Sequence, residues 1–564
     1  MCLFDQIMQS RGLVGEAREL FLSPQYEAGH DPFLLPDMKA AVDRLALARE
    51  SQEHVTIYGD YDIDGLTATT VLVDAFASFG FRFVETFIPN RFVEGYGMTV
   101  EAVERIANTG ATLIVTVDCG SLSEEPIKRA KELGVDVIVT DHHNVAPVQP
   151  PAIAVINPKR LLQDRPKDYT DFILTKRSSA GKYYPFLDLP GVGVAFKLVQ
   201  AMQTRLEGLP VGQEKWLLDL VALGTVCDVV TLVDENRMHV FWGLRVLSKT
   251  RRPGIKALMA VAGIDPENID ARALGFVLGP RMNAAGRLET AKYAQDMLLT
   301  RDTTRALELA QKLDEMNQAR RMAQDEIFKG AIVQAERYLR DPVLVLSDPN
   351  WSHGIIGIVA AKILEKYKKP TYVLQEMGEE SKGSARSYGD FSAADAIRAS
   401  DDIITKGGGH KLAAGVTLPT ENIEAFRKRV NDYFLSLNLP PQQPLLLPKD
   451  DVTIDSFLEV DEGLIGDIAK MEPFGNGNPE PILKISQATV LSARRMGADG
   501  QHVKLTLRDK NNKVLQMLAI NTPEEFFCEP GDEVSVWFQP IINEWQGVRT
   551  VEGRLLHLDK KLYF

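Results

Sequence analysis

The stretch VTIYGDYDIDG (residues 55–65) decides the fold class of this chain. Its first four residues are β-branched, apolar or aromatic and predict a buried strand, and the apolar run over 66–79 predicts a helix. Between the two stand Asp60, Asp62 and Asp64. Because residues i, i+2 and i+4 of an extended segment share one face, we expect these three carboxylates to point together into a crevice.

Three crowded carboxylates repel one another unless protons or cations intervene. A calcium loop also spaces its acids by two, but a loop of this kind that began at Asp60 would need an acid at its last position. That position is the apolar Val71. The calcium-loop interpretation is therefore excluded, and the triplet points to another kind of metal site.

The alternation of strands and helices continues along the first third of the chain. Short apolar runs predict strands at 83–88, 113–117 and 135–140, and helix-period runs predict helices at 100–107 and 123–133. Strand-helix-strand order with wholly apolar strands is typical of a parallel sheet covered on both faces. We therefore expect an α/β domain over 1–300, with its core sheet at about 50–160 and a helical part over 190–300.

The rest of the chain divides into three further parts. A charged, helix-period stretch over 301–338 predicts one long connecting helix. A second, smaller α/β unit follows over 339–437, and its strands and helix are expected at 343–346, 355–367 and 371–374. The proline-rich stretch 438–448 predicts a stiff linker. Several short strands within 449–564 predict a small β-barrel, with strands at 503–507, 514–519, 534–538 and 548–556.

The composition limits the functional classes. With 64 basic and 77 acidic residues among 564, the net charge of −13 argues against a protein that coats nucleic acid non-specifically, although a local basic channel remains compatible. The 4 cysteines include no CxxC pair, which excludes a disulfide scaffold and a thiolate zinc site and favours the cytoplasm. No apolar run has the length of a membrane helix, and the first residues lack a signal-peptide pattern.

Further acids and histidines follow other apolar runs. Asp118 ends LIVTVD, Asp141, His142 and His143 end VDVIVTDHH, and Asp228 lies in VALGTVCDVV. A lone aspartate after a strand is more often a helix cap, and paired histidines are more often turn residues. All of these segments in one sheet would instead gather at its carboxyl edge, where open parallel sheets bind ligands.

This set of ligands has a chemical preference. Oxygen ligands with one or two imidazoles favour manganese or magnesium, and zinc or cobalt are less apt. Two divalent cations that share a carboxylate would sit about 3.5–4 Å apart. Such a site suits phosphoryl hydrolysis, since it lowers the pKa of an attacking water and balances charge on the phosphate oxygens.

The signature Asp141-His142-His143, with aspartates upstream and Asp228 downstream, resembles the DHH phosphoesterase superfamily. Within it the chain is similar to the RecJ family, whose members digest single-stranded DNA from the 5′ end. The motifs that carry this resemblance are YGDYDIDG (58–65), PNRFVEGYG (89–97), GTVCDVV (224–230), GPRMNAAGR (279–287), SHGIIGIVA (352–360) and GGGHKLAAG (407–415). It spans roughly residues 50 to 480.

The resemblance implies a role for each residue of the motifs. Asp118 would bridge the two metals, His143 would face the phosphate, and Asp141 would orient an imidazole. Manganese pyrophosphatases of the superfamily have a histidine where this chain has Tyr58, which disfavours that activity. The implied metal ligands are Asp60, Asp62, Asp64, Asp118, His142 and Asp228.

The resemblance also implies a DNA path. Ser384 and Arg386 of the second α/β unit, which resembles the DHH-associated domain, would hold the terminal 5′ phosphate together with Arg91. Glycine-rich Gly407, Gly408, Gly409 and His410 would let the backbone approach a phosphate, although a plain turn is as good an explanation. Backbone contacts are implied for Arg281, Asn283, Arg287 and His353, with interdomain hydrogen bonds or a helix cap as the alternatives.

The C-terminal part would be an OB-fold that binds single strands by stacking and charge. Its candidate residues are His502, Lys504, Arg508, Trp537, Trp545 and Arg549, and Trp537 could equally belong to the core.

The sequence thus predicts a metal-dependent 5′-to-3′ exonuclease that degrades single-stranded DNA to 5′ mononucleotides in repair and recombination. The alternatives are a DHH phosphodiesterase that acts on short oligonucleotides or cyclic dinucleotides, and a non-catalytic scaffold. The extra barrel argues against the first alternative, and the intact ligand set argues against the second. Single-strand-binding protein and a helicase are partners implied by the resemblance, and we expect a monomer with no membrane contact.

Overall fold

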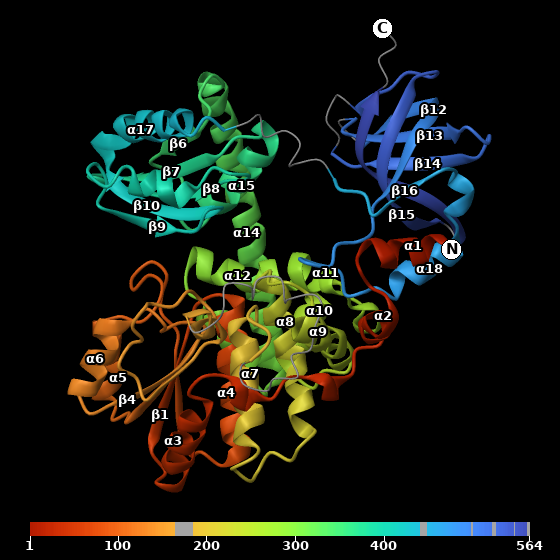
Figure 1. The fold of residues 1–564 in the computed structure, drawn as a ribbon. Coiled ribbons are helices and arrows are strands. Elements are labelled where there is room, and N and C mark those ends of the chain that lie inside the picture. Colours follow the sequence, from red (N-terminus) through yellow and green to blue (C-terminus); the bar gives the residue numbers. More distant parts are fainter. Residues whose placement is uncertain (164–183, 440–447, 498–499, 522–525, 546, 561–564) are drawn as a thin grey trace.

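The computed structural model describes residues 1–163, 184–439, 448–497, 500–521, 526–545 and 547–560. A five-stranded sheet forms the middle of the first α/β unit (Figure 1). Its strands run in the order β2-β1-β3-β4-β5, and every neighbouring pair is parallel. The strands are β1 (His54–Gly59), β2 (Phe83–Phe87), β3 (Leu113–Val117), β4 (Asp136–Thr140) and β5 (Ala154–Ile156).

Helices cover both faces of this sheet because its central strands are apolar on both sides. One face packs on α3 (Met38–Glu50), α4 (Ile63–Phe79) and α7 (Gly191–Met202) in the largest core of the molecule. The other face packs on α5 (Val100–Asn108) and α6 (Glu124–Glu132). The predicted parallel sheet is confirmed.

The stretch that precedes Asp228 departs from the prediction. We expected VALGTVCDVV to end a strand of the sheet, but Leu218–Cys227 form the helix α8, and Asp228 follows as its C-cap. A helix that is apolar on every side is buried on every side, and periodicity does not distinguish it from a buried strand. The surrounding helices are α9 (Asp234–Leu247), α10 (Pro253–Ala262), α11 (Ala271–Ala273), α12 (Gly279–Leu288) and α13 (Lys292–Leu299).

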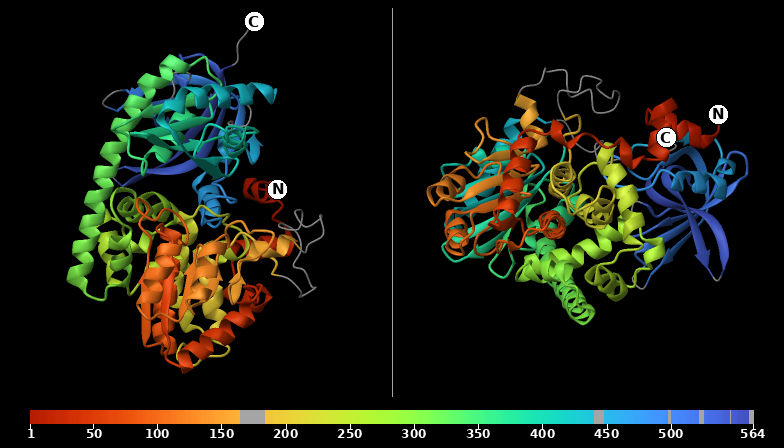
Figure 2. Two further views of the ribbon diagram at one scale, coloured as in Figure 1. Left: turned by 90° about the vertical axis from the view of Figure 1, so that its left-hand side faces the viewer. Right: turned by 90° about the horizontal axis from the view of Figure 1, so that it is seen from below.

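The predicted connecting helix is α14 (Thr303–Ala335), and Figure 2 shows it running along one side of the molecule past both α/β units. The side chain of Asp302 caps it by accepting hydrogen bonds from the backbone N–H groups of Thr304 and Arg305. Leu309 and Leu313 lie in the core of the first unit, and Ile327 and Ala331 lie in the core beside the second sheet. The helix therefore fixes the spacing of the two units.

The second α/β unit has a mixed sheet in the order β6-β7-β8-β10-β9. Only β6 and β7 are parallel, and the remaining pairs are antiparallel. The elements are β6 (Leu344–Asp348), α15 (Ile356–Tyr367), β7 (Thr371–Met377), β8 (Glu380–Arg386), α16 (Ala393–Arg398), β9 (Lys406–Gly409), β10 (Ala413–Pro419) and α17 (Ile423–Ser436).

The C-terminal strands close into the predicted barrel, since β12 pairs with β13 on one side and with β15 on the other. Its elements are β11 (Val452–Ile454), α18 (Glu462–Ala469), β12 (Leu483–Met496), β13 (His502–Asp509), β14 (Val514–Ala519), β15 (Glu533–Trp545) and β16 (Val548–Lys560). The N-terminal helix α1 (Leu3–Ser10) buries its apolar side chains in the barrel core, and Arg11 forms an ion pair of 2.6 Å with Asp451. Helix α2 (Gly15–Leu22) leads from there to the first α/β unit.

The predicted fold class is confirmed in each of its parts. The predicted domain limits 1–300, 301–338, 339–437 and 449–564 stay predictions, and most of the predicted linker 438–448 lies outside the described residues. Among the described helices, none combines the length and the apolar character that a membrane crossing requires.

Candidate metal centre

We expected the three aspartates after β1 to lie in an extended segment, but they do not. The chain turns into α4 directly after Tyr61, and Asp62 is the N-cap, whose Oδ1 accepts hydrogen bonds from the backbone N–H of Asp64 at 2.9 Å and of Gly65 at 3.2 Å. Gly65 permits this tight turn, because a Cβ there would lie 2.5 Å from the carbonyl oxygen of Asp60. Because Asp62 caps the helix, the segment cannot stay extended. The three carboxylates still face one region.

Two neighbouring strands contribute the next residues. Asp118 directly follows β3 with a left-handed backbone (φ 62°), a conformation that costs energy and tends to be kept at functional sites. Asp141, His142 and His143 directly follow β4. Asp228 reaches the same place from the end of α8. The carboxyl edge of the parallel sheet therefore carries the predicted group, with one helix end added.

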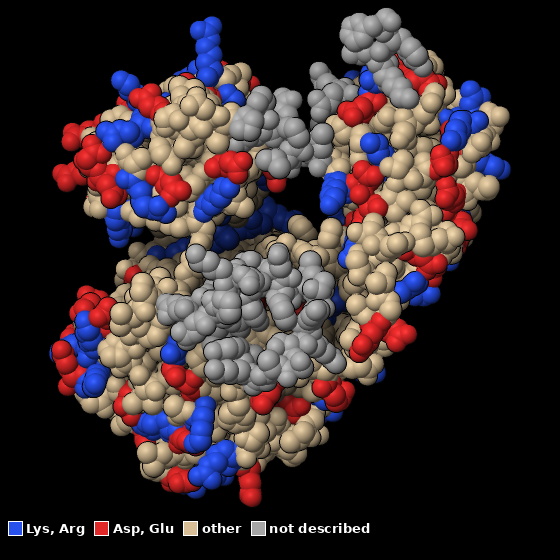
Figure 3. Space-filling model, viewed as in Figure 1, with Lys and Arg blue, Asp and Glu red and all other residues tan. Residues whose placement is uncertain are grey.

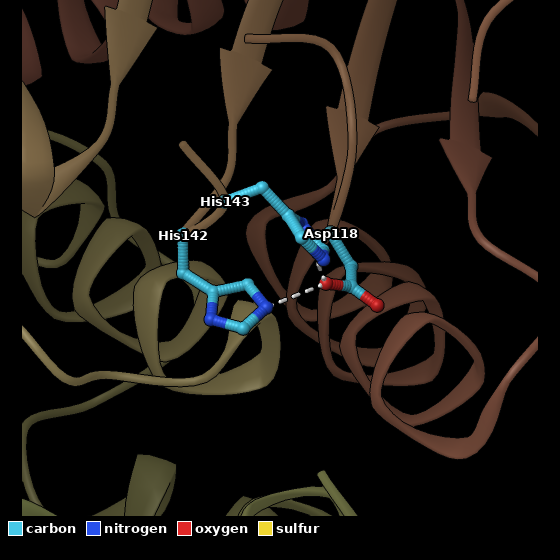
Figure 4. A group of neighbouring side chains, drawn as sticks. All are labelled: Asp118, His142 and His143. Carbon is cyan, nitrogen blue, oxygen red and sulfur yellow. Dashed lines mark ion pairs between the residues drawn. The ribbon is translucent and has the colours of Figure 1, made fainter. Parts of the chain in front are cut away.

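We call Asp60, Asp62, Asp64, Asp118, His142 and Asp228 the ligand cluster. His142 is at its centre, and the dashed line in Figure 4 marks its ion pair with Asp118. Its Nε2 lies 3.1 Å from Oδ1 of Asp118 and 3.7 Å from Oδ2 of both Asp64 and Asp228. Three sets of three side chains bring ligand atoms within 4.8 Å of one another: Asp60, Asp62 and Asp118; Asp64, His142 and Asp228; and Asp118, His142 and His143.

The buried polar atoms of the ligand cluster are suited to bind divalent cations. Oδ1 of Asp60, Oδ1 of Asp118, Nε2 of His142 and Oδ2 of Asp228 are buried and have no hydrogen-bond partner among the described residues. Leaving buried polar atoms unsatisfied costs free energy, so such atoms mark a place where a ligand is expected. Carboxylate oxygens with one imidazole nitrogen suit manganese or magnesium.

The pKa values of the cluster reflect its crowding. Burial and then the charge of Asp62 raise the pKa of Asp64 to about 7, and burial and then Asp64 raise the pKa of Asp228 to about 9. Burial and neighbouring carboxylates also raise the pKa of Asp60 and Asp118 well above the usual range. Burial and the charge of His143 lower the pKa of His142 to about 3, so its imidazole is neutral and able to bind a metal.

Asp141 orients His143. Its Oδ1 accepts hydrogen bonds from the backbone N–H of His142 at 2.7 Å and of His143 at 3.0 Å, and lies 2.9 Å from Nδ1 of the His143 ring. Although burial opposes it, the hydrogen bond with His143 and the charges of both histidines lower the pKa of Asp141. Burial would lower the pKa of His143, but the bond to Asp141 and the nearby carboxylates raise it. His143 can therefore carry positive charge beside the ligand cluster.

Four arginines lie at the junction of the two α/β units: Arg91, Arg287, Arg320 and Arg386, here called the arginine cluster. Among the described residues, no carboxylate pairs with any of them; Arg287 donates only to the carbonyl of Gly354 at 3.2 Å. Burial and the charges of Arg91 and Arg320 lower the pKa of Arg287 to about 10. Figure 3 shows basic side chains gathered in the hollow between these units. Arg320 is buried and the other three are half-buried, and guanidinium groups in such a place without a paired acid favour phosphate as a partner.

Sequence reasoning missed Arg320, although a signal was present. Arg320 of α14 continues the buried stripe that includes Leu309, Leu313 and Met316, and its guanidinium contacts only Asn317 and Gln324. An arginine at a buried position of an amphipathic stripe has to find a partner. The charge of Asp325 acts on Arg320, but no acid among the described residues forms an ion pair with it.

The structure brings together most of the other predicted DNA contacts. Arg386 donates to Oγ of Ser384 at 3.4 Å, and both lie beside Gly357 of α15. The ring of His353 packs on Phe92, which follows Arg91, with centroids 5.0 Å apart. Gly407, Gly408 and Gly409 form the exposed edge strand β9, so the plain-turn explanation does not hold, and His410 is exposed at its end.

Arg281, a predicted DNA contact, is instead bound to other residues of the protein. Its Nε donates to Oδ1 of Asp314 on α14 at 2.8 Å, and its Nη1 donates to the carbonyl of Val277, so it ties helices together. Asn283 instead lines a groove of about 690 Å³, here called the central groove, together with Arg287 and Arg320.

The barrel candidates divide in the same way. Trp537 is buried but does not belong to the barrel core, which takes Val536 and Phe538 from the other face of β15; Lys484 lies over the Trp537 ring at 4.3 Å. Lys504 pairs with Glu552 at 2.8 Å and Arg549 with Glu462 at 3.5 Å. Arg508 is exposed and His502 is half-buried, whereas the side chain of Trp545 lies outside the described part of the chain.

Three family models match the chain: the N-terminal domain of the DHH family over residues 54–225, the DHHA1 domain over 340–436 and the RecJ OB domain over 453–557. The single-stranded-DNA-specific exonuclease RecJ of Bacillus subtilis is 36% identical over 96% of this chain and 66% of its own length, so the chain spans about two thirds of that relative. The protein of the same name from Salmonella typhimurium is 34% identical over 98% of this chain and 94% of its own length.

Solved structures agree with the sequence comparison. The crystal structure of RecJ from Thermus thermophilus in complex with Mn²⁺ matches with a TM-score of 0.80 and 29% identity, over 99% of this chain and 76% of that one. The Mg²⁺ complex of the same protein matches with a TM-score of 0.76. From its domains, its near full-length relatives and its fold, the chain belongs to the RecJ family of DHH proteins.

Proposed function

We propose that this chain is an exonuclease that degrades single-stranded DNA from the 5′ end and releases 5′ mononucleotides. The observation that carries the proposal is the position of the ligand cluster, with its unpartnered buried atoms, beside an arginine cluster without acids. Relatives named as single-stranded-DNA-specific exonucleases over nearly the whole chain support the same substrate.

Two divalent cations, manganese by preference or magnesium, would be held by the ligand cluster. Asp60, Asp62 and Asp118 form one set, Asp64, His142 and Asp228 form the other, and Asp118 reaches both because its Oδ1 also lies beside His142. When bound, such a pair of cations lowers the pKa of an attacking water and neutralises charge on the phosphate.

The protein's own groups supply the remaining parts of the reaction. His143, oriented by Asp141, places a cationic imidazole beside the scissile phosphate and stabilises the negative charge that develops on it. Ser384, Arg386 and Arg91 bind the terminal 5′ phosphate across the junction of the two units. A fixed site for the chain end sets the distance to the scissile bond, and this explains cleavage from an end.

We further infer that the enzyme acts in the cytoplasm as a monomer, in repair and recombination, beside a helicase and single-strand-binding protein. The four cysteines are all unpaired in the structure, which is compatible with a reducing compartment.

An end-label assay tests the proposal. Single-stranded DNA labelled at either end, a duplex and an RNA of the same sequence are incubated with Mn²⁺ or with EDTA. Metal-dependent release of mononucleotides from the 5′ end of the single strand is expected. Cleavage of dinucleotides with long DNA left intact would instead favour the short-oligonucleotide phosphodiesterase, and binding without cleavage would favour the scaffold.

A further inference from the structure

The central groove lies between the helical part of the first α/β unit and the barrel. Cys227, which directly precedes Asp228, lines its inner end together with Asn283, Arg287 and Arg320. Arg554 of β16 lines its outer end. At about 690 Å³ the groove has the volume of a site that encloses a sizeable ligand. The groove therefore extends from Cys227, the residue next to the ligand Asp228, to the barrel, although no member of the ligand cluster lines it.

The wall opposite α12 is held firmly in place. This wall is the segment 472–480, and Arg237 of α9 donates hydrogen bonds to the carbonyls of Glu472 at 2.8 Å and Pro473 at 3.3 Å. Asn476 accepts from the backbone N–H of Leu232 at 2.7 Å, and its side chain donates to the carbonyl of Val229 at 2.8 Å. Because these hydrogen bonds hold the segment 472–480, this wall needs little ordering when a ligand binds.

Phe276 stands out on the floor of the groove. It lies in a single π-helical turn, Leu274–Leu278, and its side chain is 74% exposed although its neighbours Leu274 and Leu278 are fully buried. π-Helical turns are rare and frequently occur at functional sites. Arg272, one helical turn earlier, is exposed and has no hydrogen-bond or ion-pair partner among the described residues. The charge of Arg272 also acts on Glu480 of the same groove. An exposed aromatic ring and an exposed guanidinium four residues apart are a combination that suits the binding of single strands.

The acids of the groove are largely engaged by the protein. Asp270 caps a helix by accepting from the backbone N–H of Ala273 at 2.7 Å, and Glu480 lies 3.5 Å from Arg554. Burial raises the pKa of Glu472 and of Glu480. The charges of Asp270 and Glu480 contribute to the raised pKa of Glu472, so three acids lie close together in this part of the groove, and a strand bound there has to keep its phosphates away from them.

We propose that the DNA strand which continues past the metal site lies in the central groove, with the ring of Phe276 stacked on one of its bases and Arg272 on an adjacent phosphate. The inference rests on the proposed function and adds a binding position to it. Since every base has a π-face, this contact holds the strand regardless of sequence. It also requires a substrate long enough to reach Phe276.

The test uses 5′-phosphorylated oligonucleotides that each carry one 2-aminopurine, placed at successive positions from the 5′ end. Binding is measured in EDTA so that no strand is cut, and stacking on an aromatic ring quenches the fluorescence. We expect quenching at one or two neighbouring positions, lost in Phe276→Ala and kept in Phe276→Trp. Phe83→Ala, at a phenylalanine that is 57% exposed on β2, is the matched control and should leave the profile unchanged.

Hydrolysis rates complete the test. With Mn²⁺, Phe276→Ala should bind and degrade long strands about 5- to 10-fold less well, as expected for the loss of one stacked base. It should hydrolyse oligonucleotides too short to reach the groove at the parent rate. An unchanged fluorescence profile in Phe276→Ala would overturn the inference while leaving the proposed function intact. Failure of the parent chain to bind any strand would overturn both.

Discussion

Oδ1 of Asp118 lies 3.1 Å from Nε2 of His142, and neither atom has a hydrogen-bond partner among the described residues. The two residues end adjacent parallel strands, β3 and β4, so the register of the sheet fixes their separation. Burial keeps the imidazole neutral and raises the pKa of the carboxyl group. The pair is thus an arrangement of ligand atoms whose stability depends on a cation or a proton.

Replacing Asp118 should separate stability from activity. In Asp118→Ala we expect exonuclease activity to fall by about 1000-fold or more. The variant loses a ligand shared by the two cations that stabilise the charge of the transition state. Without metal the variant should melt about 2–4 °C higher, since a buried carboxylate no longer crowds the others. Activity and melting in EDTA measure the two effects. Asp43→Ala, at an exposed ion pair on α3, is the control, and a lower melting temperature for Asp118→Ala than for this control would contradict the expectation.

Metal affinity should rise with pH. Asp64 and Asp228 have pKa values raised to about 7 and about 9, and both must lose their protons to bind a cation. Each proton released lowers the dissociation constant by about tenfold per pH unit. Calorimetric titration with Mn²⁺ from pH 6 to pH 8 should show this trend, and buffers of different ionisation enthalpy should report the protons. An affinity independent of pH would show that these carboxylates are already ionised.

Asp141 should act through His143 and not through the metals. Asp141→Asn cannot accept the hydrogen bond from Nδ1 with full charge, so the imidazolium is less stable and less well oriented. We expect an activity loss of about 10- to 100-fold with Mn²⁺ affinity nearly unchanged. The optimum of the pH–rate profile should also shift. Loss of metal binding in this variant would assign Asp141 a structural role in the cluster instead.

The arginine cluster should determine the preference for a 5′ phosphate at the end of the strand. Arg386→Lys keeps the charge but loses the planar pair of donors, so the preference for a 5′ phosphate over a 5′ hydroxyl should shrink by about 10-fold. Competition between the two substrates in one reaction measures this ratio directly. Arg281→Lys provides the matched control, because Arg281 is paired with Asp314, and its ratio should stay at the parent value.

His239 should make stability depend on pH. It is fully buried on α9, neither ring nitrogen has a hydrogen-bond partner among the described residues, and burial lowers its pKa to about 4 from 6.5. As the pH falls below 6.5, His239 binds a proton in the unfolded chain but stays neutral in the folded one. The free energy of unfolding therefore falls between pH 6.5 and pH 4. His239→Leu should remove about 2 kcal/mol of that loss at pH 5, as measured by urea unfolding. An identical pH dependence in the variant would exclude His239 as its source.

Sequence patterns predicted the arrangement of this molecule well and its local geometry less well. The apolar strands before Asp118 and Asp141 required a buried parallel sheet, so the position of those two residues followed directly. Asp62 and Asp228 lie in the cluster for reasons that the sequence did not suggest, since a helix cap and a helix end bring them there. Arg320 was missed although it continues the buried stripe of α14, and Phe276 was missed because the sequence does not reveal the π-helical turn that exposes it. Arg281 was assigned to DNA because the sequence does not show that Asp314 lies beside it.

Helix α1 has a consequence for how the protein is made. Its apolar side chains complete the barrel core, and Arg11 meets Asp451 across 440 positions of the chain. A ribosome working at about 5–20 residues per second needs roughly 20–90 s to synthesise the stretch between them. Throughout that time the apolar face of α1 is exposed to solvent, because the barrel that covers it has not yet been synthesised. Residues 3–10 should therefore depend on a chaperone until residues 452–560 have been synthesised, and the barrel should become resistant to protease only when α1 has docked.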